Sequence, residues 1–181
     1  MTNSKVHVAL LRGINVGKSG RVKMVDLTRE LGLAGIEVTA TIVQSGNLVV
    51  TGWTATSDEL ARAIERAMAS RLSLNTRCLI RTSTELGAVL RANPFAAALE
   101  EPSRYLVHLC DPPLTANRAK EFISDAADPA NVAFAAGSLY QWCPDGISNS
   151  QPLSPLLEKR TGAAVTARNW RTLEALMAAC S

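Results

Sequence analysis

The sequence predicts an α+β protein. It has a ferredoxin-like βαββαβ N-terminal part, a second, smaller α+β part of related βαββ pattern, and a C-terminal helix. Two observations carry this prediction. In the first eighty residues, apolar runs of strand length alternate with helically spaced apolar residues in the order β-α-β-β-α-β. After residue 104 the order β-α-β-β returns. We therefore expect a ferredoxin-like subdomain over 1–82, a helical connector over 83–103 and a second subdomain over 104–181.

The strands of the first part are indicated by short apolar or β-branched runs, and its helices by apolar residues three or four positions apart. Residues 6–11 are almost all apolar, which is typical of a strand buried on both faces. Thr56 and Glu59 form a capping-box pattern that indicates a helix start. The expected strands are 6–11, 36–43, 48–53 and 76–81, and the expected helices are 24–31 and 56–72.

The segment Gln44-Ser45-Gly46-Asn47 predicts a tight hairpin turn, because Gly and Asn accept the positive φ that such turns require. In a βαββαβ arrangement the loop after the first strand and this turn lie at the same end of the sheet. We therefore expect the loop over 12–23 to lie beside the turn over 44–47.

The second part is indicated by the same kinds of signal. Thr82 with Glu85 predicts a connecting helix that ends at Asn93-Pro94. Residues 156–160 suggest a short helix, and Val165 a last element of a reduced second copy. The remaining expected elements are strands over 105–110, 132–135 and 139–143 and helices over 115–126 and 170–180, the last one capped by Asn169.

Composition indicates a globular, cytoplasmic protein. The chain has 181 residues, 47% of them hydrophobic, and no apolar run approaches the roughly 20 residues of a membrane span. The N-terminus does not resemble a signal peptide. The four cysteines lie far apart without a CxxC pair, which predicts reduced thiols. With only two histidines in addition, we expect no metal site and no cofactor.

Positive charge is concentrated at the start of the chain. The net charge is +3, yet residues 1–25 contain no acidic residue and five basic ones, Lys5, Arg12, Lys18, Arg21 and Lys23. Four of these lie in the glycine-rich loop, where backbone N–H groups and cations together favour an anion. The competing interpretation is that the glycines only shape a surface loop and that the charges are solvated.

Two familiar nucleotide-binding patterns do not fit this loop. A P-loop has four residues between its glycines, whereas Gly13 and Gly17 are separated by three. RNA-binding ferredoxin-like sheets stack bases on aromatic side chains, but no aromatic residue precedes Trp53. Trp170, beside Arg168 and Arg171, is the only basic-aromatic cluster, and we expect it to pack between the subdomains.

A serine hydrolase is equally unsupported by the sequence. Ser45 has no histidine nearby in the chain, and His7 and His108 lie within apolar strands, where a structural role is expected. The Ser45–Asn47 turn offers polar groups to a ligand, although Gly and Asn also suit a hairpin for conformational reasons alone.

Four segments, LLRGINVG, KM, QSGN and TARNWRT, resemble the pattern of a family of small bacterial proteins known as domain of unknown function 1697. The resemblance implies an α+β fold of two subdomains and no known activity. The chain departs from the family at Lys18, where a second glycine is usual, and at Ala40-Thr41, where a Thr-Tyr pair is common. The matching positions are Arg12, Gly13, Asn15, Gly17, Met24, Ser45, Gly46, Asn47, Thr166, Arg168, Asn169, Trp170 and Thr172.

These observations predict a binding protein for an anionic ligand, either a phosphorylated small molecule or nucleic acid, with no membrane partner. The alternatives are an enzyme with a polar site formed between the two subdomains, and a structural or protein-interaction module. The predicted ligand-binding residues are Arg12, Gly13, Asn15, Gly17, Lys18, Arg21, Lys23, Ser45, Gly46, Asn47, Arg168, Asn169 and Trp170.

Overall fold

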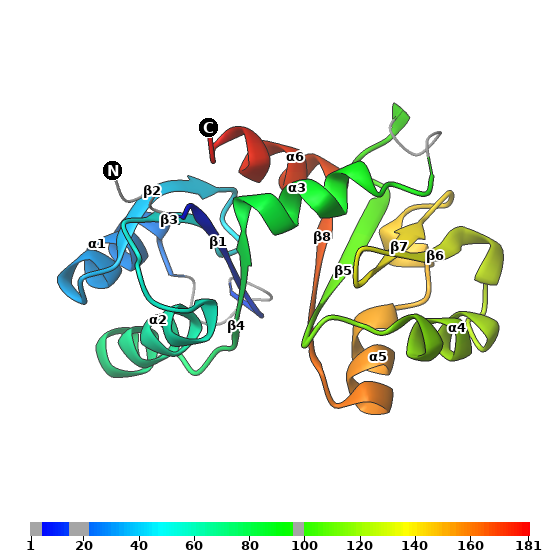
Figure 1. Cartoon of the computed structure of the whole chain (residues 1–181), viewed down its shortest axis with the longest axis horizontal. Helices are drawn as coiled ribbons and strands as arrows, with labels where there is room; N and C mark the ends of the chain where they lie inside the picture. Colours follow the sequence, from blue (N-terminus) through cyan, green and yellow to red (C-terminus); the bar gives the residue numbers. More distant parts are fainter. Residues whose placement is uncertain (1–4, 15–21, 96–99) are drawn as a thin grey trace. The chain divides into compact units, whose positions relative to one another are not determined.

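The computed structural model describes residues 5–14, 22–95 and 100–181, and it confirms the predicted α+β fold (Figure 1). The chain forms two compact units. The first unit comprises residues 1–86 and 175–181, and the second unit comprises residues 87–174. Each unit contains one four-stranded antiparallel sheet. The predicted division at residues 82 and 103 stays a prediction.

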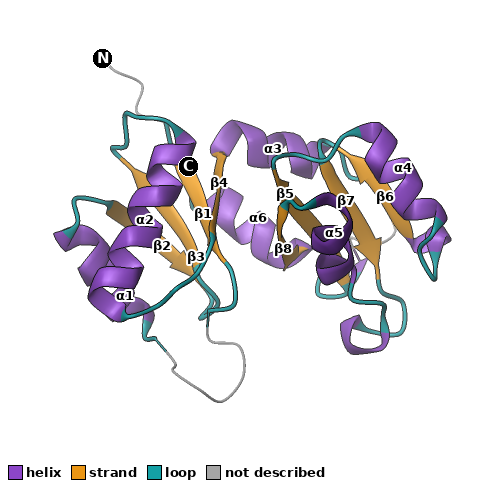
Figure 2. Ribbon diagram, turned by 90° about the horizontal axis from the view of Figure 1, so that it is seen from below, coloured by secondary structure: helices purple, strands orange, loops and turns teal. Residues whose placement is uncertain are grey.

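The first unit has the predicted β-α-β-β-α-β order, with its strands arranged β2-β3-β1-β4. Both helices lie on the same side of this sheet (Figure 2). The elements are β1 (His7–Leu11), α1 (Met24–Leu33), β2 (Glu37–Ile42), β3 (Asn47–Thr51), α2 (Ser57–Leu72) and β4 (Cys78–Thr82).

One apolar cluster explains why these elements pack together. All five residues of β1 are buried, as predicted for a central strand. Met24, Leu27 and Leu31 recur at helical spacing and turn one face of α1 into the core. The predicted capping box at the start of α2 is present, since Thr56 Oγ1 accepts the Glu59 N–H at 3.2 Å. Local signals and burial therefore agree for β1, α1 and the start of α2.

The second unit contains the predicted β-α-β-β pattern and continues it with a helix and a strand. Its strand order, β6-β7-β5-β8, repeats that of the first unit. Residues 156–160 belong to a longer helix, and Val165 lies within the last strand. The elements are α3 (Ser83–Arg91), which enters from the first unit, β5 (Tyr105–Asp111), α4 (Ala116–Ser124), β6 (Val132–Ala135), β7 (Ser138–Trp142), α5 (Leu153–Thr161), β8 (Ala164–Asn169) and α6 (Trp170–Ala178).

Within the described ranges, no helix is both long enough and apolar enough to cross a membrane. The same ranges contain no group of three His, Cys, Asp or Glu side chains suited to a metal ion. The four cysteines are free thiols, three of them buried and Cys180 half-buried.

Candidate functional site

The end of β1 lies directly against the turn between β2 and β3. The Leu11 N–H donates to the Gly46 carbonyl at 2.8 Å. The two backbones approach so closely that a Cβ on Gly46 would lie 2.7 Å from the Leu11 Cβ and 3.3 Å from that of Ile14. The predicted neighbourhood of loop and turn is thus confirmed for the described start of the loop, Leu11 to Ile14.

Arg12 is held by its backbone between this turn and the start of β4. Its N–H donates to the Arg77 carbonyl at 2.9 Å, and its carbonyl accepts a hydrogen bond from the Thr76 hydroxyl. Gly13 follows with a φ of +63° and is exposed. The chain therefore leaves β1 in a fixed direction, with a half-buried arginine at the exit.

The turn itself is stabilised by Asn47. This residue is fully buried, and its amide donates to the Ile42 carbonyl at 2.9 Å and to Ser45 Oγ at 3.0 Å. The positive φ values of the turn fall on Val43 (51°) and Gly46 (72°). Asn47 instead begins β3, so the expectation that it occupies a left-handed turn position is wrong. The Asn47 amide therefore stabilises the turn, in which Ser45 is half-buried and Gln44 is exposed.

Val43 marks this turn as strained. A β-branched side chain rarely adopts a left-handed φ, and such backbone strain is often found at functional sites. The Val43 side chain is also 56% exposed although it is apolar. Among the described loops of the first unit, only this turn combines a left-handed β-branched residue with an exposed apolar side chain.

Replacing Gly46 with alanine is expected to destabilise the protein by about 2 kcal/mol, because the new methyl group meets Leu11 at 2.7 Å and the backbone φ is positive. Urea unfolding measures this loss. Val43→Gly is the matched control, because it removes strain at the other residue of this turn with a left-handed φ. Its free energy of unfolding should equal or exceed that of the wild type. A Gly46→Ala variant as stable as the wild type would contradict the close approach.

Lys23 stands at the other end of the loop, at the N-cap position of α1. Its side chain is exposed and makes no capping hydrogen bond, so the first N–H groups of α1 are not capped by it. A helix N-terminus attracts anions, although Asp26 in the first turn already supplies negative charge there. The predicted site residues Asn15, Gly17, Lys18 and Arg21 lie outside the described residues.

The C-terminal motif has structural partners in the second unit. Asn169 Oδ1 accepts the N–H and the hydroxyl of Thr172, at 2.9 and 2.7 Å, and so caps α6 as predicted. Arg168 donates to Thr166 Oγ1 at 2.7 Å. Trp170 is 4% exposed and stacks on Tyr105, with ring centroids 5.2 Å apart. A ligand-binding role for these three residues stays a prediction.

A buried polar network around His108 could not be read from the sequence. Its Nε2 lies 2.9 Å from Gln141 Oε1, and its Nδ1 lies 2.8 Å from Ser154 Oγ. The side-chain amide of Gln141 donates to the Gln151 carbonyl, so the amide oxygen of Gln141 is the acceptor toward His108. His108 Nε2 therefore carries the proton and donates it to Gln141, and His108 Nδ1 accepts the hydroxyl hydrogen of Ser154.

Burial lowers the pKa of His108 to about 4, against a smaller opposing effect of the Gln141 hydrogen bond. The ring is therefore neutral at physiological pH. The His108 ring is 2% exposed, and both of its nitrogens have hydrogen-bond partners within the protein. These contacts join β5 to β7 and to α5, which supports the structural role expected for His108.

The comparisons with known proteins agree with this architecture. A family model described as "Protein of unknown function (DUF1697)" matches residues 4–140, well over half of the chain. The chain belongs to this family. The match includes the loop motif and the turn motif, and the TARNW motif lies beyond it.

A solved structure is also similar, that of the conserved bacterial protein SP0830 from Streptococcus pneumoniae. The similarity covers 98% of this chain and 99% of that chain, with a TM-score of 0.73 and 19% sequence identity. At this identity it supports the fold alone. No curated protein matches the chain.

Proposed function

We propose that this DUF1697 protein binds an anionic ligand, a phosphorylated small molecule or nucleic acid, where the end of β1 meets the β2–β3 turn. The described residues that support the proposal are Arg12 and Gly13 at the strand end, Ser45 and Gly46 in the turn, and Lys23 at the start of α1. The remaining predicted residues are candidates for the same site.

The uneven distribution of charge carries this proposal. The residues before Asp26 include five Lys and Arg side chains and no Asp or Glu. The residues of the first unit include eleven Lys and Arg against seven Asp and Glu, a net charge of +4, whereas those of the second unit sum to −1. Charge of one sign gathered on one unit attracts oppositely charged partners to that unit.

The backbone geometry supports the same location. The Arg12 backbone is held through both its N–H and its carbonyl, which reduces the cost of ordering the backbone when a ligand binds. Apart from its chain neighbours, the described residues place no heavy atom within 4 Å of where a Gly13 Cβ would stand, so these residues leave room for a ligand at this backbone.

Binding of inorganic pyrophosphate and of a short single-stranded oligonucleotide, measured by calorimetry at low and high salt, tests the proposal. Changing both Arg12 and Lys23 to alanine is expected to weaken binding by about tenfold or more, because each removed cation contributes a charge-assisted contact. High salt should weaken binding of the oligonucleotide in particular.

The matched control is a double variant, Arg29→Ala with Arg71→Ala, which removes the same charge elsewhere in the first unit. Both arginines pair with Glu30 and are exposed, so their loss should cost little stability. Absence of binding by both probes, or equal weakening in the control, would overturn the proposal.

A further inference from the structure

A pocket of about 520 Å³ lies in the first unit between α2 and the start of β4. It borders the site described above, because two of its residues, Thr76 and Arg77, hydrogen-bond to the backbone of Arg12. Nothing in the family motifs points to this pocket. Its lining residues are Arg62, Glu65, Arg66, Ala69, Asn75, Thr76 and Arg77.

The pocket is strongly basic. Arg62 and Arg66 are four positions apart on α2, so they lie on one side of the helix, and Arg77, the residue before β4, lines the same pocket. Glu65 is the only carboxylate in the described lining. Its Oε1 already accepts the Cys78 N–H at 2.9 Å and lies 3.7 Å from Arg77 Nε.

Arg62 and Arg66 form no ion pair within the described parts of the chain. Glu59 interacts electrostatically with Arg62, but its carboxylate is committed to the Thr56 cap, where it accepts the backbone N–H at 2.9 Å and the hydroxyl at 2.8 Å. Two cations of the pocket are thus left for an outside partner.

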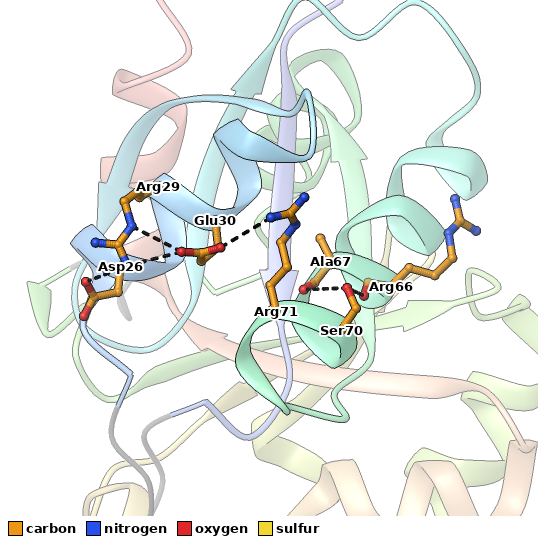
Figure 3. Close-up of polar contacts among 7 residues, drawn as sticks. All are labelled: Asp26, Arg29, Glu30, Arg66, Ala67, Ser70 and Arg71. Carbon is orange, nitrogen blue, oxygen red and sulfur yellow. Dashed lines mark hydrogen bonds and ion pairs between the residues drawn. The ribbon is translucent and has the colours of Figure 1, made fainter.

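The other arginine near the end of α2 is used differently (Figure 3). Arg71 reaches Glu30 of α1 at 3.7 Å, and Arg29 pairs with the same carboxylate at 3.2 Å. Figure 3 shows the Arg66 side chain extending away from this network. The arginines of α2 therefore divide into one neutralised within the protein and two that face the pocket.

We propose that this pocket binds the phosphate group of a small phosphorylated molecule, whose organic part packs against Ala69 and the aliphatic stems of the arginines. The inference goes beyond the proposed site at the loop and turn, and it narrows the anionic ligand to a phosphorylated small molecule. The pocket is shallow and widely open to solvent, and its volume of about 520 Å³ is enough for a small molecule, given the roughly 300–1,000 Å³ of small-molecule sites. Arginine recognises phosphate through two parallel hydrogen bonds.

The aromatic content of the first unit argues against nucleic acid as the ligand. Single-stranded nucleic acids are held by bases stacked on aromatic rings. Trp53 is the only aromatic residue in the sequence of this unit. Its indole N–H donates to the Thr56 carbonyl at 3.1 Å, and its ring packs against the core cluster. No aromatic ring lines the described pocket.

Calorimetry on the full chain tests this inference with adenosine monophosphate, ribose 5-phosphate and glucose 6-phosphate, each beside its unphosphorylated counterpart. We expect at least one phosphate ester to bind at millimolar concentration and its counterpart not to bind. Changing Arg62 and Arg66 to alanine together should weaken this binding by about tenfold or more. The Arg29→Ala, Arg71→Ala control should change it less than about twofold.

The outcomes separate this inference from the proposed function. Loss of binding only in the Arg62, Arg66 variant supports the pocket and counts against the loop and turn. Loss only in the Arg12, Lys23 variant overturns the pocket and keeps the loop. The inference is also overturned if none of the three esters binds, if a counterpart binds equally well, or if an oligonucleotide binds more tightly through Arg62 and Arg66. Far-UV circular dichroism of each variant confirms that it is folded.

Discussion

Replacing Trp170 with alanine is expected to destabilise the second unit by about 4 kcal/mol, the cost typical of removing a large buried aromatic side chain. Trp170 is the first residue of α6 and is 4% exposed. Its ring stacks on Tyr105 with an interplanar angle of 18°, and Tyr105 in turn contacts Phe95 and Tyr140. Alanine leaves this cluster open on one side.

The loss should come from packing alone. The Trp170 Nε1 has no hydrogen-bond partner among the described residues, so the variant breaks no polar contact of that atom. Trp170→Phe keeps a ring against Tyr105 and removes the unsatisfied N–H, and it should cost roughly 1–2 kcal/mol.

Urea unfolding followed by far-UV circular dichroism measures both variants. Arg171→Ala is the matched control, since the neighbouring side chain is exposed and its change should stay within about 0.5 kcal/mol. A Trp170→Ala variant that loses less than about 1 kcal/mol would contradict this structural role, and it would make a ligand-binding role for the TARNW motif more attractive.

The parts of the fold predicted from the sequence are those fixed by neighbours in the chain. The capping boxes at Thr56 and Thr82 each connect residues three positions apart, and both are present. The nearly all-apolar run over residues 6–11 predicted the buried central strand β1. The contact between Leu11 and Gly46 could be predicted from topology. A β-α-β-β-α-β order allows only a few arrangements of four strands in one sheet, and these place the two segments at the same end.

The start of α5 was missed for a local reason. Pro152 and Pro155 look like an interruption, yet proline is tolerated in the first turn of a helix, where its absent N–H has no partner to lose. The left-handed conformation predicted for Asn47 was wrong because asparagine is common for two reasons. It tolerates a positive φ within a turn, and its side-chain amide, when buried beside a turn, can hydrogen-bond to the turn backbone, as it does here.

The features with most chemical content depend on residues distant in the chain. Ser154 lies 46 positions after His108, and their hydrogen bond exists only because α5 packs near β5. The basic pocket combines α2 with the segment that leads into β4. Read along the sequence, Arg62 and Arg66 are ordinary surface arginines. The structure shows that Arg71 of the same helix pairs with Glu30, whereas Arg62 and Arg66 form no ion pair within the described residues.

Lowering the pH from about 6.5 to about 4 is expected to remove about 3 kcal/mol of stability through His108. The folded protein keeps this ring neutral because burial lowers its pKa to about 4 from the ordinary value of 6.5. The unfolded chain takes up the proton below pH 6.5, so it binds more protons than the folded state within this window. Stability therefore falls as the pH falls, and the contribution levels off below about pH 4.

His7 acts in the same direction, since burial also lowers its pKa. The two are the only histidines in the chain, so the slope of unfolding free energy between pH 6.5 and pH 5 reports on them before most carboxylates titrate. His108→Gln removes one titrating group and should flatten this slope, with His7→Gln as the matched comparison. A free energy of unfolding that stays constant from pH 6.5 to pH 5 in the wild type would contradict the burial of both rings. If His108→Gln does not fold, the pH dependence of the wild-type protein still tests the burial of the histidines. Each histidine that burial keeps neutral adds up to about 1.4 kcal/mol per pH unit to the slope of the unfolding free energy.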